Sequence, residues 1–336
     1  MNEEQYHPPT IDGHSDILID ALNQAFTGNP DRLAQVHVPK MLAGNIHAAF
    51  TPVSVDNPSG VSHESFDVIR NIDRVRQLAQ RTEGLHIVES ADEIETVMNN
   101  AEIGLFLGLE GLKPAAGDPG LIRIFHRLGI RWAGLTWNDA NEVAQGVGVA
   151  NATGLTSQGR AIVREMQQVG MLVDLTHVHR VGFFDAVELA SRPMIVSHSN
   201  PNGICPHARN LDDEQLDAIK TLNGVVGVNF FPRMVAEEGP TIEHVADHVD
   251  YLVEHIGIDH VSLGPDFIDY AIDQMGPGLA ASGIDYGTDY TYPAGLENTT
   301  KVPRLFEVLQ ERGYDREACD KIAYENLIRV IREATE

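Results

Sequence analysis

Short apolar segments rich in β-branched residues alternate along the chain with longer segments in which apolar residues recur at helical spacing. The short segments predict eight β-strands, at residues 11–18, 45–53, 103–110, 132–136, 171–176, 193–197, 224–230 and 260–264. The longer segments predict helices at residues 66–81, 157–170, 212–222, 242–256, 302–312 and 315–334. Strands that alternate with helices are typical of a parallel α/β fold, and eight is the strand number of a closed (β/α)8 TIM barrel.

The other arrangement that such a pattern allows is an open, doubly wound sheet. No Gly-x-Gly-x-x-Gly turn follows the first predicted strand and no Walker-type loop occurs, so the barrel is favoured. No linker divides the 336 residues, which predicts a single barrel domain over residues 1–336 with a short lead at about 1–9. The longest irregular stretch, about 268–300, follows the last predicted strand. Loops of that length in compact domains are usually functional.

The charge balance narrows the class of partner. Asp and Glu number 49 against 24 Lys and Arg, a formal net charge of −25 that repels nucleic-acid phosphates and anionic membrane surfaces. Neither nucleic acid nor a membrane is therefore expected as a partner. The two cysteines, Cys205 and Cys319, argue against a disulfide framework. The amino-terminal residues lack a secretory signal pattern and no run is long enough to span a membrane, so we expect a cytoplasmic location.

Six ionisable side chains fall at or near the carboxyl ends of five different predicted strands. They are His14 and Asp16 on the first strand, Glu110 on the third, His177 after the fifth, His198 after the sixth and Asp266 after the eighth. In a barrel these strand ends converge on one face, which is where the active sites of this fold lie. The sequence therefore predicts one site that contains all six.

Imidazole and carboxylate groups together are typical of a metal centre. On a strand, His14 and Asp16 would point to the same face, where burying both is costly unless something binds them. This ligand set suits zinc, and also cobalt, manganese or iron. Five ligands are more than one tetrahedral zinc needs, so two metals that share a carboxylate fit better.

Each of the six residues also has an ordinary structural explanation, as a core histidine, a helix cap or a hydrogen-bonded loop residue. Those explanations do not account for the recurrence of all six at one position of the fold. Most of the remaining histidines fall into two groups. His47 and His207 stay open as site residues, and a solvated role is expected for His37, His63, His86, His126, His244, His248, His255 and His260.

Motifs along nearly the whole chain resemble those of the renal (membrane) dipeptidase family of zinc peptidases, which are amidohydrolase-like barrels. Asp-Gly-His-Ser-Asp at 12–16 is similar to the family's Asp-Gly-His-Asn-Asp, and Leu-Gly-Leu-Glu-Gly at 107–111 to its glutamate motif. The other matches are Asp-Leu-Thr-His-Val at 174–178, Val-Ser-His-Ser at 196–199, Cys-Pro-His-Ala-Arg-Asn at 205–210, Gly-Pro-Asp-Phe at 264–267 and Pro-Ala-Gly-Leu-Glu at 293–297.

The resemblance implies a role for each matched residue. It implies two Zn²⁺ ions per chain, with His14 and Asp16 on the first, His177 and His198 on the second, and Glu110 bridging both. Arg209 would pair with the carboxylate of the substrate, a task that suits a planar guanidinium. Asp266 would hold the bridging water, accept its proton and pass it to the leaving amine.

One position departs from the family pattern. Animal members carry a histidine that contacts the substrate carbonyl after the fourth strand, and the aligned residue here is Trp137. The indole N–H of Trp137 and the side chain of Asn138 are the substrate-binding groups that could replace it.

The leading hypothesis is a dinuclear zinc dipeptidase of the metal-dependent hydrolase type, with a dipeptide as its small-molecule substrate. One alternative keeps the metals and changes the substrate to another amide, a lactone or an ester. The other is a non-catalytic binding protein on the same barrel. A homodimer is an assembly that the sequence leaves open.

Overall fold

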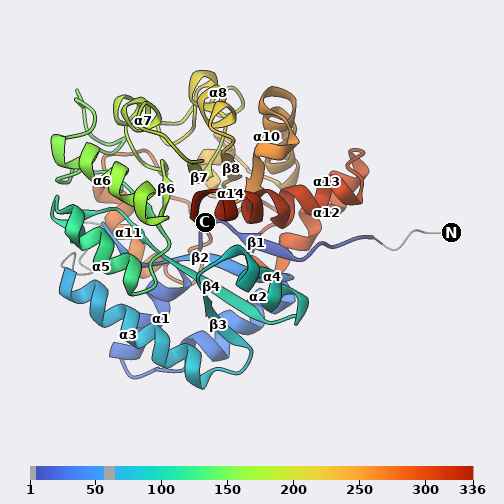
Figure 1. The fold of residues 1–336 in the computed structure, drawn as a ribbon. Coiled ribbons are helices and arrows are strands. Elements are labelled where there is room, and N and C mark those ends of the chain that lie inside the picture. Colours follow the sequence, from blue (N-terminus) through green and yellow to red (C-terminus); the bar gives the residue numbers. More distant parts are fainter. Residues whose placement is uncertain (1–4, 57–64, 336) are drawn as a thin grey trace.

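Eight parallel strands form a nearly closed barrel in the computed structural model of the protein, which describes residues 5–56 and 65–335 (Figure 1). The strands of the barrel, in spatial order, are β1 (Thr10–Asp12), β2 (Ile46–Val55), β4 (Ile103–Glu110), β5 (Trp132–Gly134), β6 (Leu172–Asp174), β7 (Ile195–Ser199), β8 (Val225–Val228) and β9 (Val261–Leu263). The Gly13 amide donates to the Leu263 carbonyl oxygen at 2.9 Å and thereby joins the first strand to the last. This architecture confirms the predicted (β/α)8 barrel.

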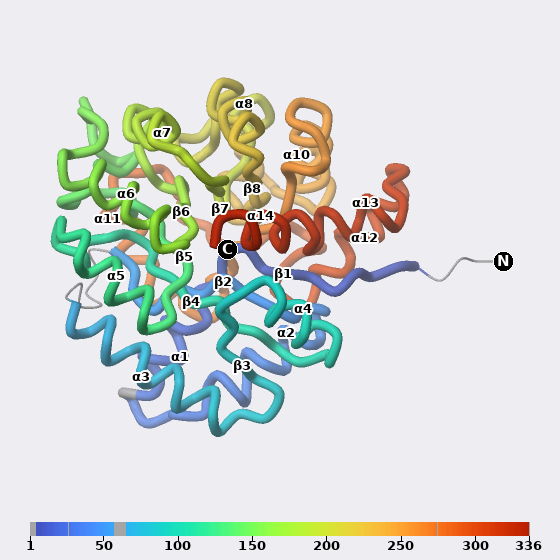
Figure 2. The backbone as a smooth tube through the Cα atoms, viewed as in Figure 1, coloured from blue at the N-terminus to red at the C-terminus, as the bar shows by residue number. Residues whose placement is uncertain are grey.

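Helices surround the barrel, and the path of the chain around it is followed most easily in Figure 2. They are α1 (Ile17–Phe26), α2 (Val38–Ala43), α3 (Ser65–Arg81), α4 (Ala91–Asn99), α5 (Pro119–Arg127), α6 (Ser157–Val169), α7 (Arg180–Val187), α8 (Asp213–Thr221), α9 (Pro232–Val235), α10 (Ile242–Ile256), α11 (Ile272–Ala281), α12 (Val302–Glu311), α13 (Arg316–Asp320) and α14 (Asn326–Thr335). Among the described residues, none of these helices has the length and apolar character that crossing a bilayer requires.

Three sequence predictions about local structure were wrong. The predicted first strand at 11–18 ends at Asp12, and residues 17–26 form helix α1 instead. The stretch at 268–300 is not irregular throughout, because it contains helix α11. A ninth strand, β3 (Leu85–Val88), was missed and pairs with the first half of β4 beside the barrel. Residues 1–4 of the predicted lead, and His63, lie outside the described residues.

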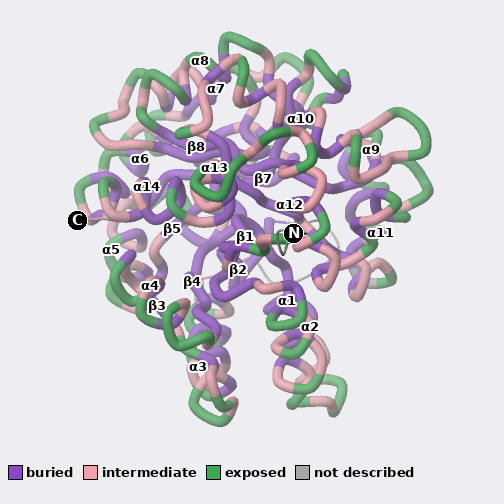
Figure 3. The backbone as a smooth tube through the Cα atoms, turned by 90° about the vertical axis from the view of Figure 1, so that its right-hand side faces the viewer, coloured by how far each residue is buried: buried purple, intermediate pink, exposed green. Residues whose placement is uncertain are grey.

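The interior of the barrel is apolar at the amino ends of the strands. One buried cluster collects inward-facing residues from successive strands, among them Ile11, Phe50, Phe106 and Trp132, and helix α14 closes it from below with Leu327 and its neighbours. The alternate strand residues, such as Leu105 and Leu107, belong to a second buried cluster, which packs between the strands and the surrounding helices. Side chains that alternate between the interior and the exterior are what a barrel strand requires. The buried centre and exposed rim are visible in Figure 3.

The side chain of Trp132 separates this apolar layer from the carboxyl end of the barrel and forms the floor of that end. Its indole Nε1 donates to the Phe106 carbonyl oxygen at 2.9 Å, and its ring lies 6.0 Å from the ring of His14 between centroids. The indole passes directly over Gly108, where a Cβ atom would lie only 2.0 Å from Trp132 Cε2. A glycine at position 108 is therefore a condition for this packing.

We expect Gly108→Ala to lower the free energy of unfolding by about 3 kcal/mol, because the added methyl group forces the buried indole to move. Urea unfolding would measure the change. Gly134→Ala is a matched control on the neighbouring strand, where the nearest atom to a new Cβ is the Gly111 nitrogen at 3.6 Å, an ordinary contact. Equal stability of the two variants would contradict the assignment of Trp132 as a tightly packed floor.

Candidate active site

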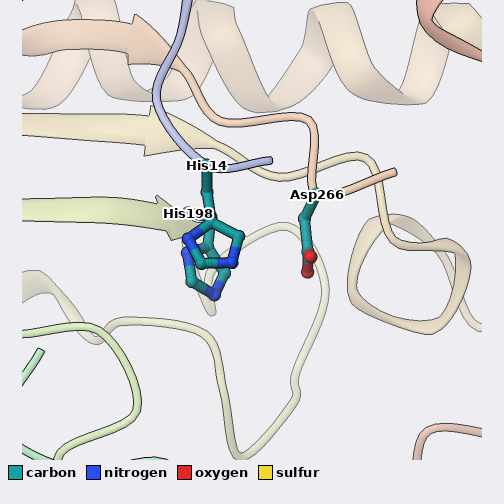
Figure 4. Close-up of side chains that lie close together, drawn as sticks. All are labelled: His14, His198 and Asp266. Atoms are coloured by element: carbon teal, nitrogen blue, oxygen red, sulfur yellow. The ribbon is translucent and has the colours of Figure 1, made fainter. Parts of the chain in front are cut away.

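The structure brings all six predicted side chains together at the carboxyl ends of the strands. Potential ligand atoms form three overlapping groups, each with its atoms within 4.8 Å of one another. They are His14, Asp16 and Glu110; Glu110, His177 and His198; and His14, His198 and Asp266. Figure 4 shows the third group, in which the rings of His14 and His198 lie against each other with Asp266 beside them.

Glu110 lies at the centre of the cluster. Its Oε1 atom is 3.0 Å from His177 Nε2 and 3.7 Å from both His14 Nε2 and His198 Nε2. It is the last residue of β4. Because it lies two residues after Gly108, whose inward side contacts Trp132, its side chain also faces the interior of the barrel. Glu110 is also the one residue shared by the first two ligand groups.

His14 and Asp16 reach the site from a loop, not from the strand that the sequence predicted. Asp12 Oδ1 accepts a hydrogen bond from the His14 amide at 3.0 Å, and the Ser15 amide donates to the Phe50 carbonyl oxygen at 2.9 Å. This turn ends the strand, because a short Asp side chain bonds the backbone two residues on. Asp16 then occupies the N-cap position of α1 without using its side chain as a cap.

Hydrogen bonds orient the two later histidines. Nδ1 of His177 donates to the amide oxygen of Asn138 at 2.8 Å. Nδ1 of His198 lies 2.8 Å from Ser197 Oγ, whose own hydrogen is directed to Asp174 Oδ2 at 2.5 Å. Both Nε2 atoms therefore keep a lone pair, and they face each other at 3.1 Å. Lone pairs that converge in this way, each fixed from the far side of its ring, are the arrangement of metal-ligating histidines.

Burial leaves several of these atoms without protein partners. Among the described residues, Nδ1 and Nε2 of His14 and Oδ1 of Asp16 have no hydrogen-bond partner, although both side chains are buried. Uncompensated polar atoms are costly in a protein interior, and a bound cation would compensate them. The donor set of imidazole nitrogens and carboxylate oxygens thus fits a transition metal such as zinc.

Burial also shifts the pKa values of the ionisable groups in the cluster. Burial and, to a smaller extent, the positive charge of Arg209 lower the pKa of the His14 imidazole to about 3. Burial raises the pKa of the Asp266 carboxyl to about 6, although Asn229 and Arg209 act in the opposite direction. The pKa values of Asp16 and Glu110 are raised well above their ordinary range, first by burial and then by neighbouring carboxylates. A divalent cation here would stabilise the ionised carboxylates.

Two site residues adopt a left-handed backbone conformation. His177 has φ of 67° and Asp266 has φ of 56°, and each lies three residues after the end of a barrel strand, β6 and β9 respectively. Such angles are uncommon outside glycine and cost of order 1–3 kcal/mol each. The surrounding packing supplies that energy, and the turn directs both side chains into the mouth of the barrel.

Arg209 lies at the edge of the cluster, in contact with His177. Its guanidinium is buried, and Nη2 donates to His177 Nε2 at 3.1 Å and to the His198 carbonyl oxygen at 3.4 Å. His207 supports the same segment, because its Nδ1 accepts from the Arg209 amide at 3.1 Å and its Nε2 contacts the Asp285 carbonyl oxygen at 2.9 Å. His207, left open by the sequence, is therefore a neighbour of the site.

Three further histidines have their hydrogen-bond partners outside the cluster. His47, the second one left open, bonds Glu102 O and Asn45 Oδ1 at the amino end of β2, opposite the site. The expectation of a solvated role was wrong for His37 and His248, which are buried. His37 Nε2 bonds Asp20 at 2.7 Å, and His248 Nε2 bonds the Val235 carbonyl oxygen at 2.8 Å.

A narrow cavity opens beside the cluster. Trp137 and Phe231 form apolar parts of its wall, Arg209 and Tyr286 contribute polar groups, and Met275 and Leu279 of α11 cover it. Its free volume is about 20 Å³, room for one or two water molecules. Of the two residues proposed to replace the missing donor, Trp137 lines this cavity, whereas the amide of Asn138 is occupied by His177 and Tyr286.

Three supporting residues were not predicted as site residues. Asn229 donates to Asp266 Oδ2 at 3.1 Å. Asp174 accepts a hydrogen bond from Ser197, the residue that contacts the ring of His198. Tyr286, from the segment after α11, accepts a hydrogen bond from Asn138. Asp174 and Ser197 lie inside motifs that the sequence had marked, so their proximity to the histidines was a usable signal. No pattern in the sequence singles out Tyr286 from the other tyrosines of its segment.

Comparisons with known proteins agree with this geometry. The family model of membrane dipeptidase (Peptidase family M19) matches residues 2–269 and 266–336. The chain is 31% identical over 343 residues to the dipeptidase tcpJ of Claviceps purpurea (strain 20.1), which covers 96% of this chain and 76% of that protein. The solved structure of an amidohydrolase from Pseudomonas aeruginosa is 25% identical with a TM-score of 0.84, and covers 98% of this chain and 97% of the other.

A metallo peptidase from Rhodobacter sphaeroides, solved with a phosphinate mimic of the dipeptide L-Ala-D-Ala, shares the fold. It is 23% identical to this chain with a TM-score of 0.84, and covers 98% of this chain and all 100% of the other.

Proposed function

Because the chain belongs to the membrane dipeptidase family, peptidase family M19, we propose that it is a metal-dependent dipeptidase that hydrolyses dipeptides with a free carboxyl terminus. The observation that carries the proposal is the convergence of two carboxylates and three imidazoles on one buried space, with Asp266 and Arg209 at its edge. A nucleophile, a proton acceptor and a carboxylate-binding cation are what peptide hydrolysis with this selectivity needs.

We propose two Zn²⁺ ions per chain. His14, Asp16 and Glu110 would hold the first, and Glu110, His177 and His198 the second. When bound, such ions supply an activated water molecule and polarise the scissile carbonyl group. The orientation of His177 by Asn138 and of His198 by Ser197 supports this division, because both rings present Nε2 to the shared space.

Asp266 is proposed as the general base. It accepts the proton of the attacking water and passes it to the leaving amine, while Asn229 holds its Oδ2 atom at 3.1 Å. Arg209 is proposed to bind the terminal carboxylate of the dipeptide, and the apolar walls formed by Trp137 and Phe231 exclude bulk water.

A steady-state comparison of Arg209→Met with the wild-type chain tests the substrate class. We expect KM for dipeptides to rise on the order of 100-fold, because a buried carboxylate loses its charged partner at a cost of about 3 kcal/mol. Hydrolysis of an amide substrate without a carboxylate should be unchanged. The control is Arg180→Met, which removes an exposed ion pair with Asp212 outside the cavity. Failure of a zinc-loaded wild-type chain to cleave any L-L, L-D or D-D dipeptide would refute the proposed function.

A further inference from the structure

Tyr286 enters the cavity from the segment between α11 and α12. Its side chain is 5% exposed and packs edge-on against Phe231, with ring centroids 5.3 Å apart. The hydroxyl oxygen lies 2.9 Å from Asn138 Nδ2, and Arg209 lines the same cavity as Tyr286. Tyr286 thus contacts the residue that orients His177 and shares the cavity with the proposed carboxylate-binding residue.

The direction of the hydrogen bond to Asn138 follows from the chemistry of that residue. Asn138 uses its oxygen to accept from His177 Nδ1, so only its NH₂ group faces Tyr286. An amide NH₂ group is a donor, so it donates to the hydroxyl oxygen, and within the described part of the chain the O–H hydrogen has no acceptor in any hydrogen bond of Tyr286. That hydrogen is available to a ligand in the cavity that Tyr286 lines.

We propose that Tyr286 is a substrate-binding residue whose hydroxyl donates to the terminal carboxylate of the dipeptide beside Arg209. This inference rests on the proposed dipeptidase function. A carboxylate accepts several hydrogen bonds, and a hydroxyl whose oxygen already accepts one is polarised as a donor. Together the guanidinium and the phenol would select a free carboxylate over a neutral terminal amide, because the amide offers its NH₂ group to sites that only donate.

The experiment compares wild type and Tyr286→Phe on a dipeptide and on the same dipeptide with a carboxamide terminus. For the dipeptide we expect KM to rise roughly 10-fold with kcat nearly unchanged, as for loss of one hydrogen bond to a charged group. The kcat/KM for the amide should stay constant, so the preference for the carboxylate falls by the same factor. Zinc content should equal that of the wild type, which excludes an indirect effect through Asn138 and His177.

Tyr290→Phe is the matched control. Tyr290 lies on the same segment and packs against the same Phe231 ring, at 5.9 Å between centroids, but it does not line the cavity. Its kinetic constants should not change. An unchanged KM in Tyr286→Phe, an equal loss on both substrates, or a loss confined to kcat would overturn this inference while dipeptide hydrolysis by the wild type stood. A wild-type chain without dipeptidase activity would overturn the proposed function as well.

Discussion

Asp266→Asn is expected to lower kcat for dipeptide hydrolysis by about 1,000-fold while the metal content stays at the wild-type level. General acid–base catalysis contributes on the order of 10²- to 10⁴-fold, and an amide cannot accept the proton of the attacking water. The replacement preserves the local structure, because asparagine tolerates the left-handed backbone found at this position, where φ is 56°. Steady-state kinetics together with metal analysis of the same preparation measure both quantities.

Asp269→Asn is the control for this prediction. Asp269 lies three residues further along the same segment, where it forms an ion pair with Lys40 at 3.3 Å and does not line the cavity. It removes one carboxylate at nearly the same place in the sequence and should leave kcat unchanged. Near-wild-type turnover in Asp266→Asn would remove Asp266 from the role of general base, whatever its effect on KM.

The convergence of the site could be predicted because it depends on strand order more than on local detail. Glu110, His177 and His198 follow apolar runs whose strand character is unambiguous, and parallel strands in a barrel bring their carboxyl ends together. His14 and Asp16 were placed correctly in space although the predicted strand around them was wrong. A strand end and the loop after it lie at the same edge of a barrel, so the error did not move them out of the site.

The error at residues 11–18 has a physical cause. Short apolar runs do not distinguish a buried strand from the start of a helix, and Ile17 and Leu18 fit either. The strand ends at Asp12 because its side chain accepts a hydrogen bond from the His14 amide, and this bond turns the chain. The inward aim of Tyr286 depends on how a long segment folds back over the barrel mouth. No local periodicity encodes that contact, so the sequence alone does not predict Tyr286 as a residue of the cavity.

Glu110→Gln is expected to abolish metal binding at both proposed sites and to reduce dipeptide hydrolysis by at least about 10⁴-fold, the combined loss of an activated nucleophile and a polarised carbonyl. Glu110 Oε1 lies within 3.7 Å of three imidazole nitrogens and is common to both proposed ligand groups, so its replacement would affect both. Metal analysis of the purified variant gives the stoichiometry. The exposed Glu311→Gln on α12 removes the same charge far from the cluster and should retain the wild-type metal content.

The stability of this variant separates loss of a ligand from loss of the fold. In the metal-free chain, burial and the nearby carboxylates raise the pKa of Glu110 above its ordinary value of 4.5, so the folded state binds the proton more tightly than the unfolded state does. The free energy of unfolding of metal-stripped wild type should therefore fall as pH rises above 4.5, and the glutamine variant should lack this contribution. Added zinc should raise the melting temperature of the wild type and not that of Glu110→Gln. A variant that keeps two metals per chain, or gains the full stabilisation from zinc, would show that Glu110 does not bridge them.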